Sequence, residues 1–247
     1  MKPITIPFEC ITPCFCAGAD QAHAEIRPSA IRASLRWWFR CLGGTPEQET
    51  SAFGGANPVT ASAFQVRVSQ ITPKTVGTLP SPNKKDSPLA YILHFASIAG
   101  GKKSNFGSGP RWDQTGCLGP GTTFTLTIRQ LRNIPDDTEI LFGKAVTAFQ
   151  HYGSIGMRVT RGMGAVQATV VTSESFTDCD QMLTSAGFTM RMSNRAHQDW
   201  VKVMEEAGKW LKNDLRKEFG AGDDKNPKAS ALGSIQPVRQ TSAVYLR

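Results

Sequence analysis

Residues 15–43, FCAGADQAHAEIRPSAIRASLRWWFRCLG, combine a short loop with one strongly patterned helix. Pro28 suits a helix entrance because it has no backbone N–H to leave unpaired, and Ser29 is expected to cap the first turn. Gly43 and Gly44 are expected to end the helix, because glycine reaches the left-handed conformation at low cost. The sequence therefore predicts one helix between Pro28 and Gly43.

Two stripes run along this predicted helix. Apolar side chains recur every three or four residues, which predicts a buried face. Arginines recur every four residues beside them, and guanidinium groups stay charged and bind phosphate oxygens in pairs. A solvated basic face is the alternative interpretation. The apolar stripe consists of Ile31, Leu35, Trp38, Phe39 and Leu42, and the basic stripe consists of Arg32, Arg36 and Arg40.

The charge balance favours a polyanionic partner. The chain of 247 residues has 28 Lys and Arg against 20 Asp and Glu, which gives a formal net charge of +8. Nucleic acid is the simplest partner for such a chain. No stretch is apolar for long enough to span a bilayer, and the early prolines and glutamate do not fit a signal peptide. We therefore expect a cytoplasmic protein with no membrane contact.

Three of the six cysteines lie close together near the N-terminus, at Cys10, Cys14 and Cys16, with His23 nearby. A zinc site is one interpretation of this cluster. The spacing C-x3-C-x-C lacks the paired C-x2-C knuckles of structural zinc sites, and no second pair follows. Ordinary buried thiols in a reducing compartment are the favoured interpretation. We expect neither a metal nor a cofactor.

The order of the expected elements indicates an α+β fold. Alternating or apolar runs predict strands, and a second helix is expected over residues 138–151, capped by Asp136 or Asp137. Residues 45–61 are expected to be irregular because of their glycine, proline and threonine content. The order strand, helix, strand, strand, helix, strand is that of a ferredoxin-like (RRM-like) βαββαβ core with long insertions. The strands are expected at residues 3–11, 62–70, 122–131 and 165–172.

Two domains are expected. Residues 1–175 would form the core, and residues 176–247 would form a helical C-terminal extension that includes a helix over 194–219 and ends in a short strand. Within the core, a strand is expected at 89–96, and the basic, glycine-rich run 100–121 suits either an RNA backbone with stacked bases or a mobile insertion.

A second glycine-rich segment, HYGSIGMRVTRGMGAVQ, lies between the second helix and the last strand of the core. Its glycines bracket Arg158 and Arg161. Such a turn allows a close approach of the backbone to a ligand and leaves N–H groups for anions. The segment matches neither G-x-G-x-x-G nor G-x-x-x-x-G-K-[ST], so the nucleotide motifs do not apply. An ordinary tight turn with two surface arginines is the alternative.

Several stretches together resemble the Cmr-type RAMP proteins of type III CRISPR effector complexes, and most of all the RAMP subunit at the complex head, over the 3′ part of the guide. CFCAGADQAHAEIRPSAIRASLRWWFRCLGG is similar to their N-terminal signature, and AFGGANPVTASAFQVRV to their Phe-Gly-Ser segment. The glycine-rich segment and VRQTSAVYLR resemble later family elements. Departures occur at Ala33, in Phe53-Gly54-Gly55, and at Ser154, which replaces a glycine of the loop.

The resemblance implies a ferredoxin-like protein that binds CRISPR RNA, contacts target RNA and assembles with other type III effector subunits. In the family, the first helix, the loop before it and the glycine-rich loop hold the RNA backbone. Trp37 would stack on a base or pack on a neighbouring subunit. The RNA-binding residues carried over are Gly18, Ala19, Asp20, Arg27, Arg32, Arg36, Arg40, Gly153, Gly156, Arg158, Arg161, Gly162 and Gly164.

The expected subunit is non-catalytic, and two alternatives stay open. Some RAMP backbone subunits cut target RNA with a loop aspartate, and Asp20 lies in the corresponding region. A metal-dependent endonuclease that uses Asp20 is therefore the first alternative. The second is a structural adaptor that contacts only protein.

Overall fold

The computed structural model divides into two compact units, which are Met1–Leu79 with Ala99–Arg195, and Pro80–Ile98 with Ala196–Arg247. Most of the basic run 100–121 and the terminal strand lie outside the described residues. Of the strand predicted at 89–96 only Ile92 is described, and it is helical, so the prediction is wrong at that residue. None of the helices in the described part of the chain has the length and apolar character to cross a membrane. The structure describes residues 3–20, 23–76, 88, 92, 117–190, 192–193, 195 and 197–215.

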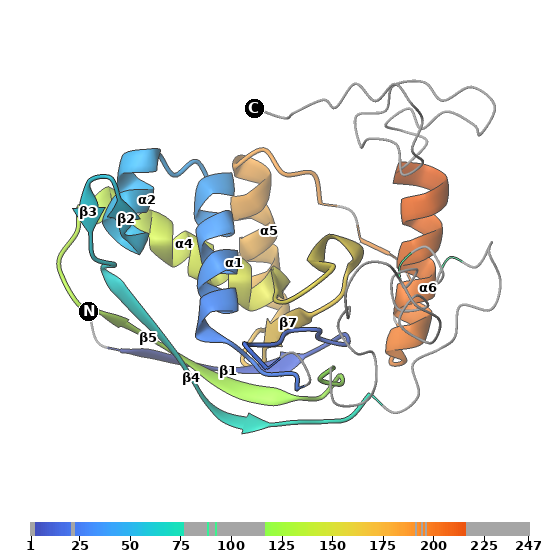
Figure 1. The fold of residues 1–247 in the computed structure, drawn as a ribbon. Helices are drawn as coiled ribbons and strands as arrows, with labels where there is room; N and C mark the ends of the chain where they lie inside the picture. Colours follow the sequence, from blue (N-terminus) through green and yellow to red (C-terminus); the bar gives the residue numbers. More distant parts are fainter. Residues whose placement is uncertain are drawn as a thin grey trace, which may run out of the picture. The chain divides into compact units, whose positions relative to one another are not determined.

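An antiparallel sheet of five strands, in the order β4-β5-β1-β7-β6, forms the base of the first unit (Figure 1). Strand β1 (Ile4–Cys10) pairs with β5 (Thr123–Gln130) on one side and with β7 (Ala165–Ala168) on the other. Strand β4 (Phe64–Thr72) flanks β5, and the short β6 (Gly153–Ser154) flanks β7. The strands predicted at 3–11, 62–70, 122–131 and 165–172 are therefore all present, although β7 ends four residues early.

Alternation along the strands decides which face of the sheet is buried. In β1, Ile6, Phe8 and Cys10 are buried, while the residues between them face the other way. In β5, Phe124 lies opposite Phe8, and the two rings stack with their centroids 5.3 Å apart. The period-2 pattern thus builds one apolar sheet face and one polar face.

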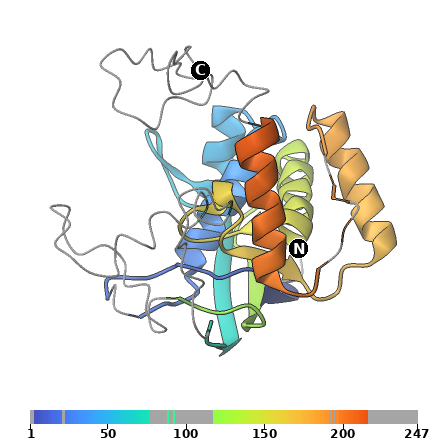
Figure 2. The same cartoon turned by 90° about the vertical axis from the view of Figure 1, so that its right-hand side faces the viewer.

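Helices cover this apolar face in a single layer (Figure 1). Helix α1 (Pro28–Cys41) and helix α4 (Asp136–Tyr152) pack on the sheet, and α2 (Pro46–Phe53) follows α1. Helix α5 (Ser173–Ser185) lies beside α4, and Figure 2 shows it at the outer side of the layer. The fold is mixed α+β, with an antiparallel sheet and helices on one face.

The apolar stripe of α1 is buried as predicted, but its predicted cap is wrong. Ile31, Leu35 and Phe39 are fully buried. The N-cap is Arg27, which makes no side-chain capping hydrogen bond, and Pro28 opens the helix. Ser29 therefore lies inside the first turn. At the other end, Gly43 has φ of +97°, so it ends the helix as expected.

The prediction that residues 45–61 are irregular is wrong. This segment contains α2 and a small hairpin of β2 (Gly55–Ala56) and β3 (Val59–Thr60). Thr45 and Gln48 form a capping box, in which the Gln48 amide donates to Thr45 Oγ1 over 3.2 Å and the Thr45 amide donates to Gln48 Oε1 over 3.1 Å. This reciprocal cap starts a helix despite the composition of the segment.

Helix α5 was not predicted as a separate element either. It begins with a second capping box, formed by Thr172 and Ser175. Its contact with α4 includes polar bonds, since His151 Nε2 lies 3.0 Å from Ser175 Oγ and the Tyr152 hydroxyl donates to Asp180. The Phe176 ring also packs on the rings of His151 and Tyr152. The carboxylates expected to cap α4 lie in its first turn, since α4 begins directly after Pro135.

The second unit contains α6 (Trp200–Trp210), which continues into one wider turn at η2 (Leu211–Leu215). Asp199 caps α6 by accepting a hydrogen bond of 2.9 Å from the Val201 amide. The helix predicted over 194–219 is present over the middle of that range, and Met204 on its expected apolar side is buried.

Candidate nucleic-acid interface

The opening loop runs from β1 to α1 and is folded back on itself. The Glu25 amide donates to the Cys16 carbonyl over 2.8 Å. Cys14 pairs through its backbone with Leu118, and the Cys14 amide donates to the Leu118 carbonyl over 2.9 Å. These bonds fix the path of the loop before α1 begins.

The glycine-rich loop, residues 153–164, lies directly against the opening loop. The Met157 amide donates to the Phe15 carbonyl over 2.9 Å, and the Gly164 amide donates to the Pro13 carbonyl over 2.8 Å. The Thr12 hydroxyl donates to the Gly162 carbonyl over 2.7 Å. Two segments separated by more than a hundred residues therefore form one surface, which we call the loop junction.

Glycine is required at the closest contacts of the loop junction. Gly156 has φ of +87°, and a Cβ atom at this position would lie 2.6 Å from the Phe15 carbonyl oxygen. Gly164 has φ of +64°, and a Cβ atom there would collide with the Ile155 carbonyl oxygen. The left-handed backbone and the close approach both exclude a side chain. Gly156 thus allows the close contact between the two loops, and Gly164 allows the glycine-rich loop to fold against its own residue Ile155.

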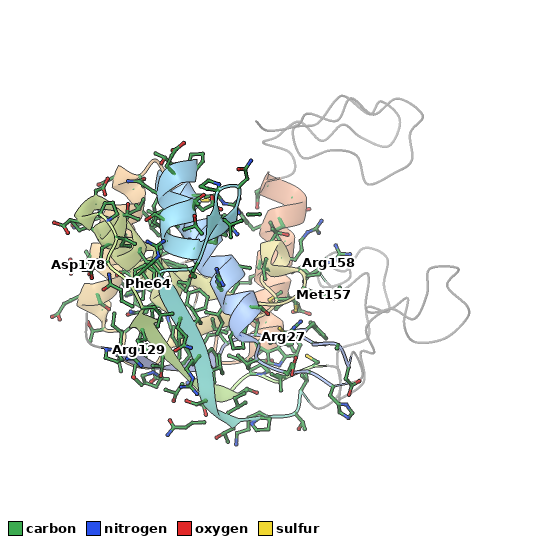
Figure 3. The ribbon with its side chains drawn as sticks, turned by 60° about the vertical axis from the view of Figure 1, so that its left-hand side comes forward. Arg27, Phe64, Arg129, Met157, Arg158 and Asp178 are labelled. Atoms are coloured by element: carbon green, nitrogen blue, oxygen red, sulfur yellow. The ribbon has the colours of Figure 1, made fainter. Side chains whose placement is uncertain are left out.

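Three of the predicted RNA-binding arginines lie at the loop junction. Figure 3 shows Arg27, Met157 and Arg158 on the same side of the molecule, with Asp178 on the opposite side. Arg27 lies 3.3 Å from the Ala17 carbonyl through Nη1 and 3.2 Å from Glu25 Oε1 through Nε. Arg158 is exposed in a left-handed conformation with φ of 60°, and Arg161 is half-buried.

The basic stripe of α1 has a different environment, because α2 lies against it. Arg36 donates to the Glu49 carboxylate, and Arg40 Nε lies 3.7 Å from the other oxygen of the same carboxylate. Arg32 donates to the carbonyl of Phe53, the last residue of α2. All three arginines therefore hold α2 against α1. This role was not predicted from the sequence, because α2 was not predicted.

A further arginine, which the sequence analysis did not single out, completes the support of α2. Arg132 Nη2 donates to the Ser51 carbonyl over 2.6 Å and to the Ala61 carbonyl over 3.2 Å. The carbonyls at a helix C-terminus have no partners within the helix, and cations there are favourable. Arg32 and Arg132 thus both bind carbonyls at the C-terminal end of α2.

Asp20 lies on the exposed part of the opening loop, where its Oδ2 is 2.6 Å from His23 Nδ1. Both side chains are largely exposed. Its neighbour Gly18 lies close to the Glu25 carboxylate, which a Cβ atom at that position would displace. In the described part of the chain, no three His, Cys, Asp or Glu side chains gather as a metal site.

The two tryptophans of α1 differ in environment. Trp38 is 7% exposed and packs on Phe188 with a ring distance of 5.8 Å, whereas Trp37 is 48% exposed. Trp37 meets Trp38 edge-on, with the ring centroids 4.8 Å apart. Trp38 therefore belongs to the core, and Trp37 is half-exposed at the surface.

The clustered cysteines are buried beneath the loop junction. Cys10, Cys14, Cys16 and Cys117 are all buried, and each is a free thiol. A hydrogen bond with the Cys10 side chain is the largest cause that raises the pKa of Cys14, and burial raises it further. Burial also raises the pKa of Cys117 above its ordinary value. Cys14 and Cys117 are therefore protonated, packed thiols at neutral pH.

Comparison with known proteins fits this arrangement. The family model of the RAMP superfamily matches residues 7–167, which include the sheet, the basic stripe and the loop junction. The chain belongs to the RAMP superfamily. The family predicted from the motifs is thereby confirmed.

Two relatives of this RAMP protein come from Pyrococcus furiosus. The CRISPR system Cmr subunit Cmr1-1 is 27% identical over 172 residues, which cover 63% of this chain and 44% of that protein. The chain thus spans less than half the length of this curated relative. The crystal structure of Cmr1 in its apo form matches with a TM-score of 0.55 and 19% identity, over 88% of this chain and 74% of that one. That structural likeness concerns the fold.

A cryo-electron-microscopy structure of a type III-B Cmr-beta complex bound to cognate target RNA has a chain that matches more distantly. The TM-score is 0.44 and the identity 15%, over 87% of this chain and 64% of that one.

Proposed function

We propose that this RAMP protein is a non-catalytic RNA-binding subunit of a type III-B (Cmr) CRISPR effector. It would bind CRISPR RNA and target RNA, contact neighbouring effector subunits, and occupy the head of the complex in the cytoplasm. The likeness to Cmr1-1 supports the assignment to this kind of complex. The net charge of +8 supports a polyanionic ligand.

The loop junction is the observation that carries the proposal. It joins Arg27 of the opening loop to Arg158 and Arg161 of the glycine-rich loop through backbone hydrogen bonds. Arginines held at a fixed spacing neutralise successive phosphates of one strand. The exposed parts of Arg36 and Arg40 would continue this path along α1, with Glu49 as their internal partner.

We also propose the ferredoxin-like assignment for the core. β1 and β4 run in the same direction with β5 between them, and β5 and β7 run in the same direction with β1 between them. This split βαβ arrangement supports a ferredoxin-like unit. A division into a core of residues 1–175 and a helical extension of residues 176–247 is part of the same proposal.

Salt dependence tests the proposal. The purified chain should bind a single-stranded oligoribonucleotide, with an affinity that falls steeply as salt rises. The variant Arg27→Glu/Arg158→Glu/Arg161→Glu should bind more weakly, and each lost phosphate contact should reduce the slope of log K against log salt by about 0.7. The same affinity and slope in this variant would contradict the proposal.

The Asp20–His23 pair favours one second candidate, an endonuclease. An exposed carboxylate that orients an imidazole is not needed for binding alone, whereas an Asp–His pair can take part in proton transfer at a ribose hydroxyl. Loss of target cleavage by the assembled complex in Asp20→Ala, with RNA binding preserved, would establish this function. Unchanged cleavage would leave the non-catalytic role. A protein-only adaptor would bind RNA with no dependence on salt, or not at all.

A further inference from the structure

The tip of the glycine-rich loop exposes two apolar side chains, one on each side of Arg158 in the sequence. Met157 is 42% exposed and Val159 is 37% exposed, in a segment where Arg158 is also exposed. Burial in the core therefore does not explain why apolar residues occur at this tip. Figure 3 shows Met157 at the surface between Arg27 and Arg158.

The backbone holds Met157 rigidly in this place. Its amide donates to the Phe15 carbonyl, and its neighbours Gly156 and Arg158 both have positive φ values, +87° and 60°. A non-glycine residue in the left-handed region is uncommon and is maintained only where the surrounding structure fixes it. The loop thus presents the Met157 side chain from a fixed backbone.

We propose that Met157 contacts a nucleobase of single-stranded RNA while the flanking arginines bind its phosphates. This inference rests on the proposed function and adds that the loop junction contacts bases as well as the backbone. A thioether makes favourable contacts with aromatic rings, and apolar side chains such as methionine can insert between stacked bases. Only an unpaired strand leaves its bases accessible to such a contact.

The positive charge around Met157 favours RNA over a protein partner. Figure 3 shows Arg27 and Arg158 on the same side of the molecule as Met157, and Arg161 follows within the same turn. A phosphate backbone supplies negative charge on both sides of each base, which matches an apolar residue flanked by guanidinium groups. An apolar pocket on another subunit would bind the methionine alone and would leave the flanking arginines without a role.

Removal of the bases separates this contact from backbone binding. The full chain and its Met157→Ser and Met157→Leu variants would be titrated with an oligouridylate and with an abasic oligoribonucleotide of the same length. Met192→Ser is the matched control, because Met192 is 80% exposed in the same unit and lies outside the loop junction.

We expect Met157→Ser to weaken binding of the oligouridylate by about threefold to tenfold and to leave binding of the abasic strand unchanged. Met192→Ser should bind both strands like the wild type, and Met157→Leu, which keeps an apolar side chain, should bind the oligouridylate more tightly than Met157→Ser does. Equal affinities of Met157→Ser and wild type for the oligouridylate, or an equal loss on both strands, would overturn the base contact while leaving the RNA-binding function. Failure of the wild type to bind either strand would overturn the proposed function itself.

Discussion

The backbone amide of Met157 donates a hydrogen bond of 2.9 Å to the carbonyl oxygen of Phe15. This bond joins the glycine-rich loop to the opening loop and brings Arg158 to the same side of the molecule as Arg27. The proposed RNA path depends on this junction more than on the long basic stripe of α1, since that stripe is engaged with α2.

Replacement of Gly156 by alanine should separate the two loops. The added Cβ atom would lie 2.6 Å from the Phe15 carbonyl oxygen at a φ of +87°. We expect the free energy of unfolding to fall by about 1–3 kcal/mol, with a loss of RNA affinity. Urea unfolding and RNA titration measure the two effects.

Gly143→Ala is the matched control for that experiment, because Gly143 lies within α4 and a Cβ atom there meets nothing within 4 Å. Alanine in a helix interior is more favourable than glycine by up to about 1 kcal/mol, so this variant should be slightly more stable and bind RNA normally. Normal stability and affinity in Gly156→Ala would show that the junction does not need the glycine.

The ion pair between Arg36 and Glu49 should contribute to stability in a double-mutant cycle. Glu49 is only 12% exposed, while 42% of the Arg36 side chain is exposed, so solvent screening reduces the interaction. We expect a coupling of about 0.5–1 kcal/mol between Arg36→Gln and Glu49→Gln, measured by urea unfolding.

Glu49→Gln should leave RNA binding intact or slightly tighter, because it removes a carboxylate that competes with phosphate. Arg129→Gln is the control, since Arg129 is exposed at the end of β5 and should change stability by less than about 0.5 kcal/mol. A coupling of zero would mean that the contact between α1 and α2 does not depend on this pair.

The adjacent tryptophans of α1 should respond differently to truncation. Trp38→Ala should destabilise the protein by about 3–5 kcal/mol, because Trp38 is 7% exposed in the core. Trp37→Ala removes a side chain that is 48% exposed and should cost much less. Thermal and urea unfolding of the two variants measure the difference, and similar losses would contradict the assigned environments.

The buried thiols should make the protein sensitive to alkali. The pKa values of Cys14 and Cys117 are raised in the folded state above the ordinary value of 9.0. Below pH 9 both states keep these protons, whereas above it the unfolded chain ionises first. Stability should therefore fall as pH rises, by about 1.4 kcal/mol per pH unit for each such thiol.

Cys117→Ala tests this origin of the pH dependence. Its free energy of unfolding should decline less steeply between pH 9 and the pH of alkaline unfolding, because one buried thiol is absent. The slopes of the free energy of unfolding against pH are compared, because the substitution also removes packing and so changes the free energy at every pH. Identical slopes for the variant and the wild type would assign the alkaline loss to other groups.

The sequence predicted the strands and α1 because their apolar periodicity is strong and local. It missed α2 because the glycines and prolines of residues 45–61 outweighed one signal, the T-x-x-Q capping box at Thr45 and Gln48. The partners of Arg32, Arg36 and Arg40 were lost with it. A basic stripe cannot be assigned to RNA until the elements that cover it are known.

The contact between the two loops was not predictable from side-chain patterns. The bonds from the Met157 and Gly164 amides end on the carbonyls of Phe15 and Pro13, so they are independent of residue type. The glycines indicated that another group approaches the backbone of this loop closely, but they did not identify that group. Only the family resemblance associated the two loops before the structure did.

Crosslinking of single-stranded RNA to the full chain tests the central claim most directly. RNA that contains 4-thiouridine would be irradiated in complex with the protein, and the attached residues would be mapped by mass spectrometry. The account predicts crosslinks in both the opening loop and the glycine-rich loop, around Arg27 and Met157. Crosslinks confined to the polar face of the sheet, around Arg67 and Arg129, would contradict it.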